Sequence, residues 1–294
     1  MKRWSLITPR SLVLALSVTL VACFSEDATP PPLPVTQAAV SRGQQIAEGF
    51  GSCGFCHTMQ GKVGAPLAGG RQMQDLYGDI VGPNITIAAS GIGEWTEPDV
   101  KNLFRSNQRP DESVLYSPFH KGFEWMSDAD LTAIIAYLRS LPPTEKVIEH
   151  RELSFIDRNT TGFFRSKAEV TGYVPTISSS FRAEYGQYVA DNLAGCARCH
   201  SRPGGLFSSD DYLAGGQEVS LDGESKVAPN ITSSKTTGIG EWSDDDIKRY
   251  LATGQTPSGR QIDKKFCPVE FYSQAPSFDV DALVAYLRTV PAID

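Results

Sequence analysis

A five-residue pattern, Cys-x-x-Cys-His, occurs twice in this chain of 294 residues and constrains its fold more than any other feature. The pattern stands at residues 53–57 and again at 196–200. Four further blocks return in the same order: Leu-Ala-Gly-Gly at 67 and 213, Pro-Asn-Ile-Thr at 83 and 229, Gly-Ile-Gly-Glu-Trp at 91 and 238, and Ala-Tyr-Leu-Arg at 136 and 285. The separations drift only from 143 to 149 residues. Such a repeat indicates one duplicated module, and two copies predict two domains rather than a solenoid.

Cys-x-x-Cys-His is the pattern of covalent haem attachment. Two thiols at this spacing can add to the two vinyl groups of one haem, and the adjacent histidine then faces the iron. The sequence therefore predicts two covalently bound haem c groups. The attachment residues are Cys53, Cys56, Cys196 and Cys199, and the first axial ligands are His57 and His200. A zinc site, a redox Cys-x-x-Cys pair and a disulfide are the alternatives. They are disfavoured because each copy lacks further ligands at zinc spacing and any βαβ context for a redox motif.

Helix signals recur at matching places in the two copies. Residues 37–50 predict a helix that leads into the first Cys motif. Thr96 can cap a helix with Pro98 in its first turn. Residues 127–130 and 243–246 each resemble a capping box, with Asp in place of the usual Glu. Because no alternating strand pattern is present, we expect a mainly α protein with Gly-rich loops between the helices.

Each module resembles a class I cytochrome c domain, and most closely the repeated haem domains in cytochrome subunits of membrane-bound alcohol and sugar dehydrogenases. The repeated blocks given above carry this resemblance, which covers residues 40–143 and 182–292. It implies two tandem cytochrome c domains, each wrapped around one covalent haem. We place module one at 39–143, a connector at 144–180 and module two at 181–294. The family's subunits usually bind three haems and are anchored at the C-terminus, whereas this chain has two motifs.

The resemblance also places a Met-Pro pair 19 residues before the Tyr of the last block, as the sixth ligand of the iron. In module two this position reads Cys267-Pro268. The four methionines stand at 1, 59, 73 and 126, so module two has none. We therefore predict that Cys267 ligates the second haem and gives it a low potential, because a thiolate favours ferric iron. Lys264, Lys265 or an open iron are alternatives, and Cys267 could also be a small buried apolar residue.

In module one the corresponding position is Pro118, within a segment that looks about two residues shorter than in the family. This places His120 in the ligand position. Met126 is the alternative ligand. However, Met126 directly precedes the capping residue Ser127, which gives it a structural role as a hydrophobic staple.

The N-terminus resembles that of an exported lipoprotein. A basic start and a short apolar run end at Leu20-Val21-Ala22-Cys23, which predicts a signal peptide over 1–22 and lipidation of Cys23. An ordinary signal peptide with a chance cysteine is the alternative. The Pro-rich residues 23–38 predict an extended tether from a membrane to the haem domains. We expect a periplasmic, lipid-anchored protein, and Phe24 after the cysteine favours the outer membrane.

Charge and site chemistry bound the function. With 34 acidic and 27 basic side chains the chain is a poor candidate for binding nucleic acid. It suits a redox partner with a basic docking face. We expect transfer of single electrons between periplasmic or membrane-bound partners, such as a dehydrogenase or other cytochromes. The alternatives are a haem enzyme that acts on a sulfur compound or peroxide at the Cys267-ligated haem, and a haem-based redox sensor. No catalytic residue is predicted, and the question of enzymatic activity stays open, with the carrier favoured.

Overall fold

The computed structural model describes residues 36–75, 77–115, 118–155, 170–202 and 211–294, which belong to one compact unit. The predicted signal peptide, Cys23 and nearly all of the predicted tether lie outside the described residues. Among the helices of the described ranges, none combines the length and the hydropathy needed to cross a bilayer. The boundaries expected for the modules and the connector stay predictions.

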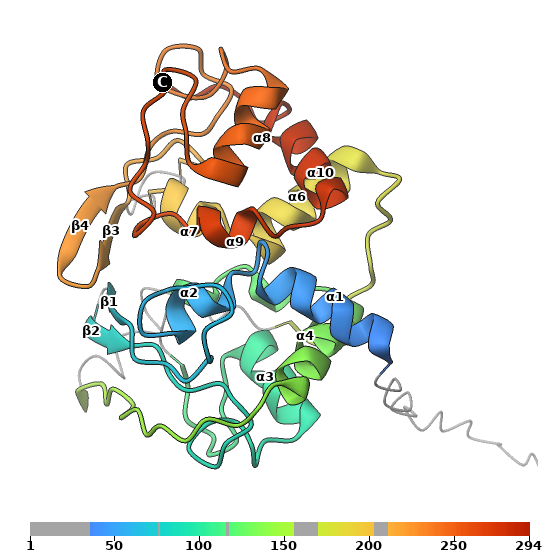
Figure 1. The fold of residues 1–294 in the computed structure, drawn as a ribbon, viewed down its shortest axis with the longest axis vertical. Coiled ribbons are helices and arrows are strands. Elements are labelled where there is room, and N and C mark those ends of the chain that lie inside the picture. The colour runs from blue at the N-terminus through green and yellow to red at the C-terminus, as the bar shows by residue number, and fades with distance from the viewer. Residues whose placement is uncertain (1–35, 76, 116–117, 156–169, 203–210) are drawn as a thin grey trace, which may run out of the picture. The chain divides into compact units, whose positions relative to one another are not determined.

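The two modules repeat the same order of elements (Figure 1). Module one contains α1 (Gln37–Ala47), α2 (Cys53–His57), β1 (Gln72–Asp75), β2 (Gly78–Val81), α3 (Glu97–Ser106), the short 3-10 turns η1 (Pro118–His120) and η2 (Phe123–Trp125), and α4 (Asp128–Ser140). Module two contains α6 (Arg182–Tyr188), the π-helical η3 (Val189–Leu193), α7 (Ala197–His200), β3 (Glu218–Leu221), β4 (Glu224–Val227), α8 (Asp244–Thr253), α9 (Val269–Tyr272) and α10 (Ser277–Leu287). The mainly helical fold expected from the sequence is confirmed.

Helix starts follow the capping residues that the sequence offers. Thr96 caps α3 and Ser243 caps α8, and each forms a complete capping box with the Asp three residues on. At α4 only half of the predicted box forms. The Ser127 hydroxyl accepts from the Asp130 backbone N–H, but the Asp130 carboxylate does not return to the cap. It binds Arg42 instead, so a long-range ion pair has displaced the local hydrogen bond.

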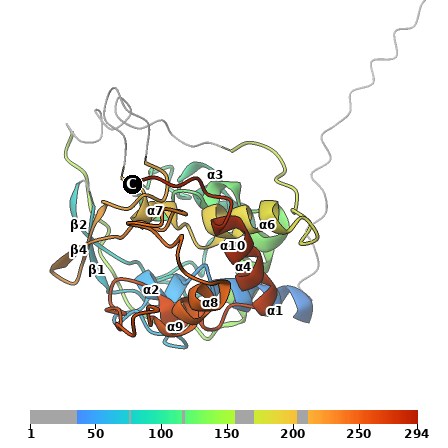
Figure 2. The ribbon, with the colours of Figure 1, turned by 90° about the horizontal axis from the view of Figure 1, so that it is seen from above.

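A glycine allows the first and last helices of each module to cross closely. α1 packs on α4, and α6 packs on α10 (Figures 1 and 2). A Cβ on Gly43 would lie 1.9 Å from the carbonyl oxygen of Ala133, and one on Gly186 would lie 2.0 Å from that of Ala282. Any larger residue would push the helices apart, so the duplicated Gly is a requirement of the fold.

A small four-stranded sheet, for which the sequence showed no pattern, joins the modules. Its order is β2-β1-β3-β4 and all pairs are antiparallel. Met73 of β1 faces Leu221 of β3 at the junction, and both side chains are buried. Each strand has only four residues and most of their side chains are at least partly exposed. Such short and largely polar strands leave no alternating pattern that could be read from the sequence.

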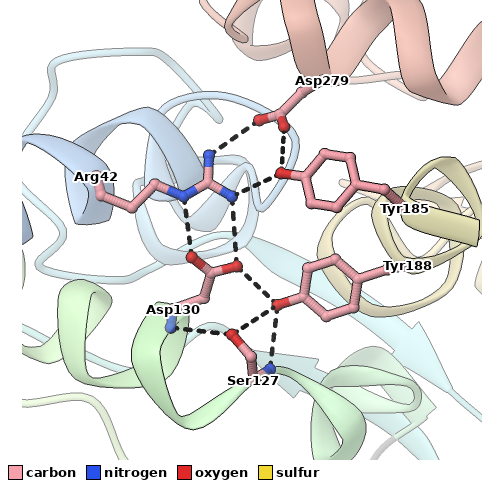
Figure 3. Close-up of polar contacts among 6 residues, drawn as sticks. All are labelled: Arg42, Ser127, Asp130, Tyr185, Tyr188 and Asp279. Carbon is pink, nitrogen blue, oxygen red and sulfur yellow. Dashed lines mark hydrogen bonds and ion pairs between the residues drawn. The ribbon is translucent and has the colours of Figure 1, made fainter. Parts of the chain in front are cut away.

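A buried polar cluster links the helices of the two modules (Figure 3). Arg42 of α1 donates to Asp130 of α4 at 2.9 Å, and also to Asp279 of α10 and the Tyr185 hydroxyl of α6, both at 3.1 Å. The Tyr185 hydroxyl donates to Asp279 at 2.6 Å, and the Tyr188 hydroxyl donates to Asp130 at 2.7 Å. One guanidinium therefore satisfies a carboxylate from each module.

Replacement of Arg42 should remove the cation that Asp130 and Asp279 share. We expect Arg42→Leu to lower the free energy of unfolding by about 3–5 kcal/mol, because it leaves buried charges unpaired. Denaturant unfolding of the haem-loaded protein measures this loss. The control is Arg182→Leu, since Arg182 is 65% exposed and pairs with Asp281 at 3.6 Å. Arg182→Leu should lower the free energy of unfolding by less than about 1 kcal/mol. Equal losses in the two variants would contradict the role of Arg42.

The pKa of Asp279 is raised by burial, which outweighs the opposing contributions of Arg42 and Tyr185. A carboxyl with a raised pKa in the folded state contributes stability that is present at low pH and lost as pH rises through the folded-state pKa. We therefore expect the stability of the wild type, relative to Asp279→Asn, to fall between pH 4 and pH 7. Unfolding of both proteins across this range measures the trend. A relative stability that rises toward pH 7 would mean that the ion pair outweighs burial.

Candidate haem-binding sites

The first attachment site lies on one short helix. Cys53 and Cys56 are almost one turn apart on α2, and His57 ends the helix. The His57 ring Nδ1 lies 2.8 Å from the carbonyl oxygen of Pro83. A carbonyl only accepts, so Nδ1 carries the proton and Nε2 keeps the lone pair that can bind a metal. Burial lowers the pKa of His57, which keeps the ring neutral.

The second site repeats this arrangement. The His200 ring Nδ1 lies 2.7 Å from the carbonyl oxygen of Pro229, and burial again lowers the pKa of the histidine. The histidine carbonyls are also held alike. That of His57 accepts from Gly69 at 2.8 Å, and that of His200 accepts from Gly215 at 2.7 Å. The repeated Leu-Ala-Gly-Gly and Pro-Asn-Ile-Thr blocks thus hold each histidine from two sides.

The Pro-Asn-Ile-Thr asparagines fix the loops around these histidines. The Asn84 amide donates to the carbonyl of Thr144 at 2.9 Å. The Asn230 amide donates to that of Ile293 at 2.6 Å. Each asparagine ties its loop to the segment that follows the last helix of its module.

The thiols do not behave as a redox pair or a zinc site. Within the described residues all five cysteines are free, and no group of three or more His, Cys, Asp or Glu is placed to hold a metal ion. Burial raises the pKa of Cys53 to about 12 and that of Cys56 to about 11. A redox-active cysteine would need a lowered pKa instead. Paired, neutral thiols beside a neutral histidine fit haem attachment.

His120 lies opposite His57. The two ring centroids are 6.2 Å apart, with 41° between the ring planes. Two imidazoles that ligate one metal from opposite sides have centres roughly 6 Å apart, given bonds of about 2 Å and centres about 1 Å behind the nitrogens. The His120 Nδ1 is buried and has no hydrogen-bond partner in the described part of the chain. Phe104 and Phe123 flank the ring, with centroids at 5.6 and 5.8 Å. The spacing fits an iron held between the two histidines.

Met126, the alternative ligand, lies in the hydrophobic core. Its side chain is 1% exposed and belongs to the same buried cluster as Leu131. It directly precedes the Ser127 cap of α4, where a buried apolar side chain serves the helix start. This is the structural role that the sequence offered for it.

Cys267 lies just before α9, and its thiol is close to the attachment cysteines of module two. Burial, together with the nearby Cys199 and Cys196, raises its pKa to about 12. The two alternative lysine ligands are engaged elsewhere. Lys265 pairs with Glu224 at 2.9 Å, and Lys264 lies 3.9 Å from Glu270.

The backbone limits where the two modules differ in length near His120 and Cys267. An isolated antiparallel bridge precedes each of them: Gln108–Val114 in module one and Gln255–Gln261 in module two. The bridges are 147 residues apart, as are His120 and Cys267, whereas the cap residues of the last helices, Ser127 and Pro276, are 149 apart. The two-residue difference between the modules therefore lies between residues 114 and 127 of module one, and His120 matches Cys267 when it is placed after His120. Sequence blocks flanking this segment could not locate it.

Comparisons with known proteins agree with this geometry. The cytochrome c family model matches residues 40–142. The diheme cytochrome c-type protein of Cereibacter sphaeroides is 31% identical over 263 residues, which cover 86% of each chain. The chain belongs to the di-haem c-type cytochromes. As in such cytochromes, each haem supplies an iron that gains or loses one electron.

Two relatives are longer. The fructose dehydrogenase cytochrome subunit of Gluconobacter japonicus is 31% identical over 97% of this chain. The cytochrome c subunit of alcohol dehydrogenase (quinone) of Gluconobacter oxydans is 27% identical over 95% of it. This di-haem cytochrome spans 59% of the length of each.

Removal of the attachment cysteines of one motif should abolish covalent binding of that haem alone. We expect the wild-type polypeptide, denatured and weighed by mass spectrometry, to carry two haems, and the Cys196→Ala/Cys199→Ala variant to carry one. Cys267→Ser is the matched control and should keep both, because its thiol forms no thioether. A double variant that still carried two haems would show that the second motif is not an attachment site.

Proposed function

We propose that this cytochrome carries single electrons between a dehydrogenase and a further redox protein. The observation that supports this proposal most is the placement of the His120 ring 6.2 Å from that of His57, measured between ring centroids. His57 and His120 serve the first haem, and His200 and Cys267 serve the second. Irons with both axial positions filled exchange electrons without binding a substrate. The dehydrogenase partner is suggested by the relatives, which are named as cytochrome subunits of such enzymes.

The His120 ring has the protonation state that ligation requires, whereas the Cys267 thiol would have to lose its proton. Burial lowers the pKa of His120 to about 3, so its ring is neutral and a lone pair is available. The Cys267 thiol would stay protonated beside uncharged neighbours, since its pKa is about 12. A bound metal reverses this preference, because a coordinating thiol is deprotonated outright.

Export and membrane attachment complete the proposal. The signal-like start and Cys23 support a lipid-anchored protein in the periplasm, with the outer membrane as the favoured site. The formal net charge of −7 supports a partner with a basic docking face. Haem enzyme and redox sensor remain alternatives, and both require a ligand position that opens.

Replacement of Cys267 tests the ligand of the second haem. We expect Cys267→Met to change the ferric spectrum and to raise the potential of one haem by on the order of 100 mV, within the span of roughly 0.8 V that axial ligands cover. Spectroelectrochemical titration measures both effects. Lys264→Met, three residues away, is the control and should change neither. An unchanged ferric spectrum in Cys267→Met would remove Cys267 as a ligand.

Carbon monoxide distinguishes the carrier from the enzyme. The reduced wild type should bind carbon monoxide slowly or not at all, because each iron already has two protein ligands. Stopped-flow absorbance measures the binding, and His120→Ala is the positive control, since it should open the first haem. Rapid binding to the wild type would favour the enzyme or sensor alternative.

A further inference from the structure

Each module's ligand segment packs against the other module's attachment helix. Gly54 of α2 lies against Phe271 of α9, where an added Cβ would be 2.9 Å from the ring. On the opposite side, the Asn192 amide donates to the carbonyl of Gly122 at 2.8 Å. Gly122 closely follows His120 in sequence, and Phe271 closely follows Cys267. The interface between the modules therefore lies beside both proposed iron ligands.

Arg198 connects the second attachment motif to the first ligand segment. It is one of the two spacer residues between Cys196 and Cys199. Its guanidinium donates to the carbonyl oxygens of its own loop and to that of Phe119, the residue before His120. It also lies 4.2 Å from the ring centroid of Phe123, which packs on His120.

Arg71 makes the reciprocal connection. Its guanidinium donates to the carbonyl oxygen of Phe55, a spacer residue of the first motif, at 2.6 Å, and lies 4.2 Å from the Phe55 ring centroid. It also donates to the carbonyl oxygen of Lys265, two residues before Cys267, at 2.8 Å, and to Asp222 at 3.3 Å. Arg71 is only 2% exposed.

A glycine makes room for each guanidinium. A Cβ on Gly61 would lie 2.3 Å from a terminal nitrogen of Arg71, and one on Gly195 would lie 2.0 Å from the Arg198 Nε. The two arginines do not stand at repeated positions, because the residue equivalent to Arg198 in the first motif is Phe55. Each module thus has a guanidinium that contacts an aromatic ring, a glycine and a backbone carbonyl of the other module, and different residues form this arrangement in the two cases.

We propose that Arg71 and Arg198 are positioning residues, each of which holds the sixth-ligand segment of the other module's haem. The proposal rests on the ligand roles of His120 and Cys267. A guanidinium offers five donors in a fixed planar fork, so it can join two backbone segments while it stacks on an aromatic ring. The consequence is a crossed dependence: Arg198 sets the ligand geometry of the first haem, and Arg71 sets that of the second.

The test uses the haem-loaded full chain and reads each haem separately. His120→Met and Cys267→Met first assign the spectral and redox components, because each alters the ligand of one haem. Arg198→Lys and Arg71→Lys are then compared with the wild type by ferric spectroscopy and redox titration. We expect Arg198→Lys to change the spectrum of the first haem, and to alter its reduction equilibrium about tenfold, which is 59 mV for one electron. Arg71→Lys should do the same to the second haem.

Lysine keeps the charge but not the fork, so a purely electrostatic role would leave these variants unchanged. Arg249→Lys on the exposed side of α8 is the matched control. Gly195→Ala displaces the Arg198 guanidinium without removing it and should reproduce the effect on the first haem. Changes confined to the arginine's own haem, or no larger than in Arg249→Lys, would overturn the proposal. If the His120 and Cys267 variants themselves leave both spectra unchanged, the ligand assignment is wrong. The positioning roles proposed for Arg71 and Arg198 are then wrong as well.

Discussion

A planar cofactor bound through one short helix leaves one of its faces open, and the rest of each module is built to cover that face. The histidine of the motif is fixed by its hydrogen bond to a proline carbonyl, so its free nitrogen points in one direction only. A second segment, about 65 residues further along the chain, must then reach the opposite face. In module one this segment brings His120 to 6.2 Å from His57, measured between ring centroids. The close helix crossings at Gly43 and Gly186 fix the first and last helices of each module, between which the attachment motif and the second segment lie in sequence.

The segments that cover the open faces also form the contact between the modules. Most of the buried apolar residues of both copies belong to one cluster, which includes Leu131 of α4 and Leu283 of α10. Beside it, Arg42 joins carboxylates from both modules (Figure 3). A buried ion pair of this kind adds little net stability, because desolvation offsets the attraction. It does, however, favour a single arrangement of the two modules, since any other would leave a charge unpaired.

The sequence was sufficient for features that depend on local chemistry. The attachment cysteines, the paired histidines and the caps at Thr96 and Ser243 all lie within a few residues of their partners, and the structure has them as expected. Features that depend on distant partners could not be predicted in this way. The half-formed box at α4 is one, because Asp130 binds Arg42, 88 residues earlier in the chain. The pairing of the strands is another, since a strand of four residues is too short to show a clear alternation of apolar and polar side chains.

In the proposed ligation the two modules supply unlike iron ligands, and this difference would give electron transfer between the two haems a direction. His120 would offer the first iron a neutral ring, whereas Cys267 would offer the second a thiolate. An anionic ligand stabilises ferric iron more than a neutral one does, so the second haem should have the lower potential. Electrons would then pass from the second haem to the first. The cation of Arg198 lies near the attachment cysteines of both modules, where it offsets part of the rise in their pKa that burial causes. A nearby positive charge favours the reduced state of both haems. It would therefore raise both reduction potentials and partly offset the lowering by the Cys267 thiolate, while the second haem keeps the lower potential.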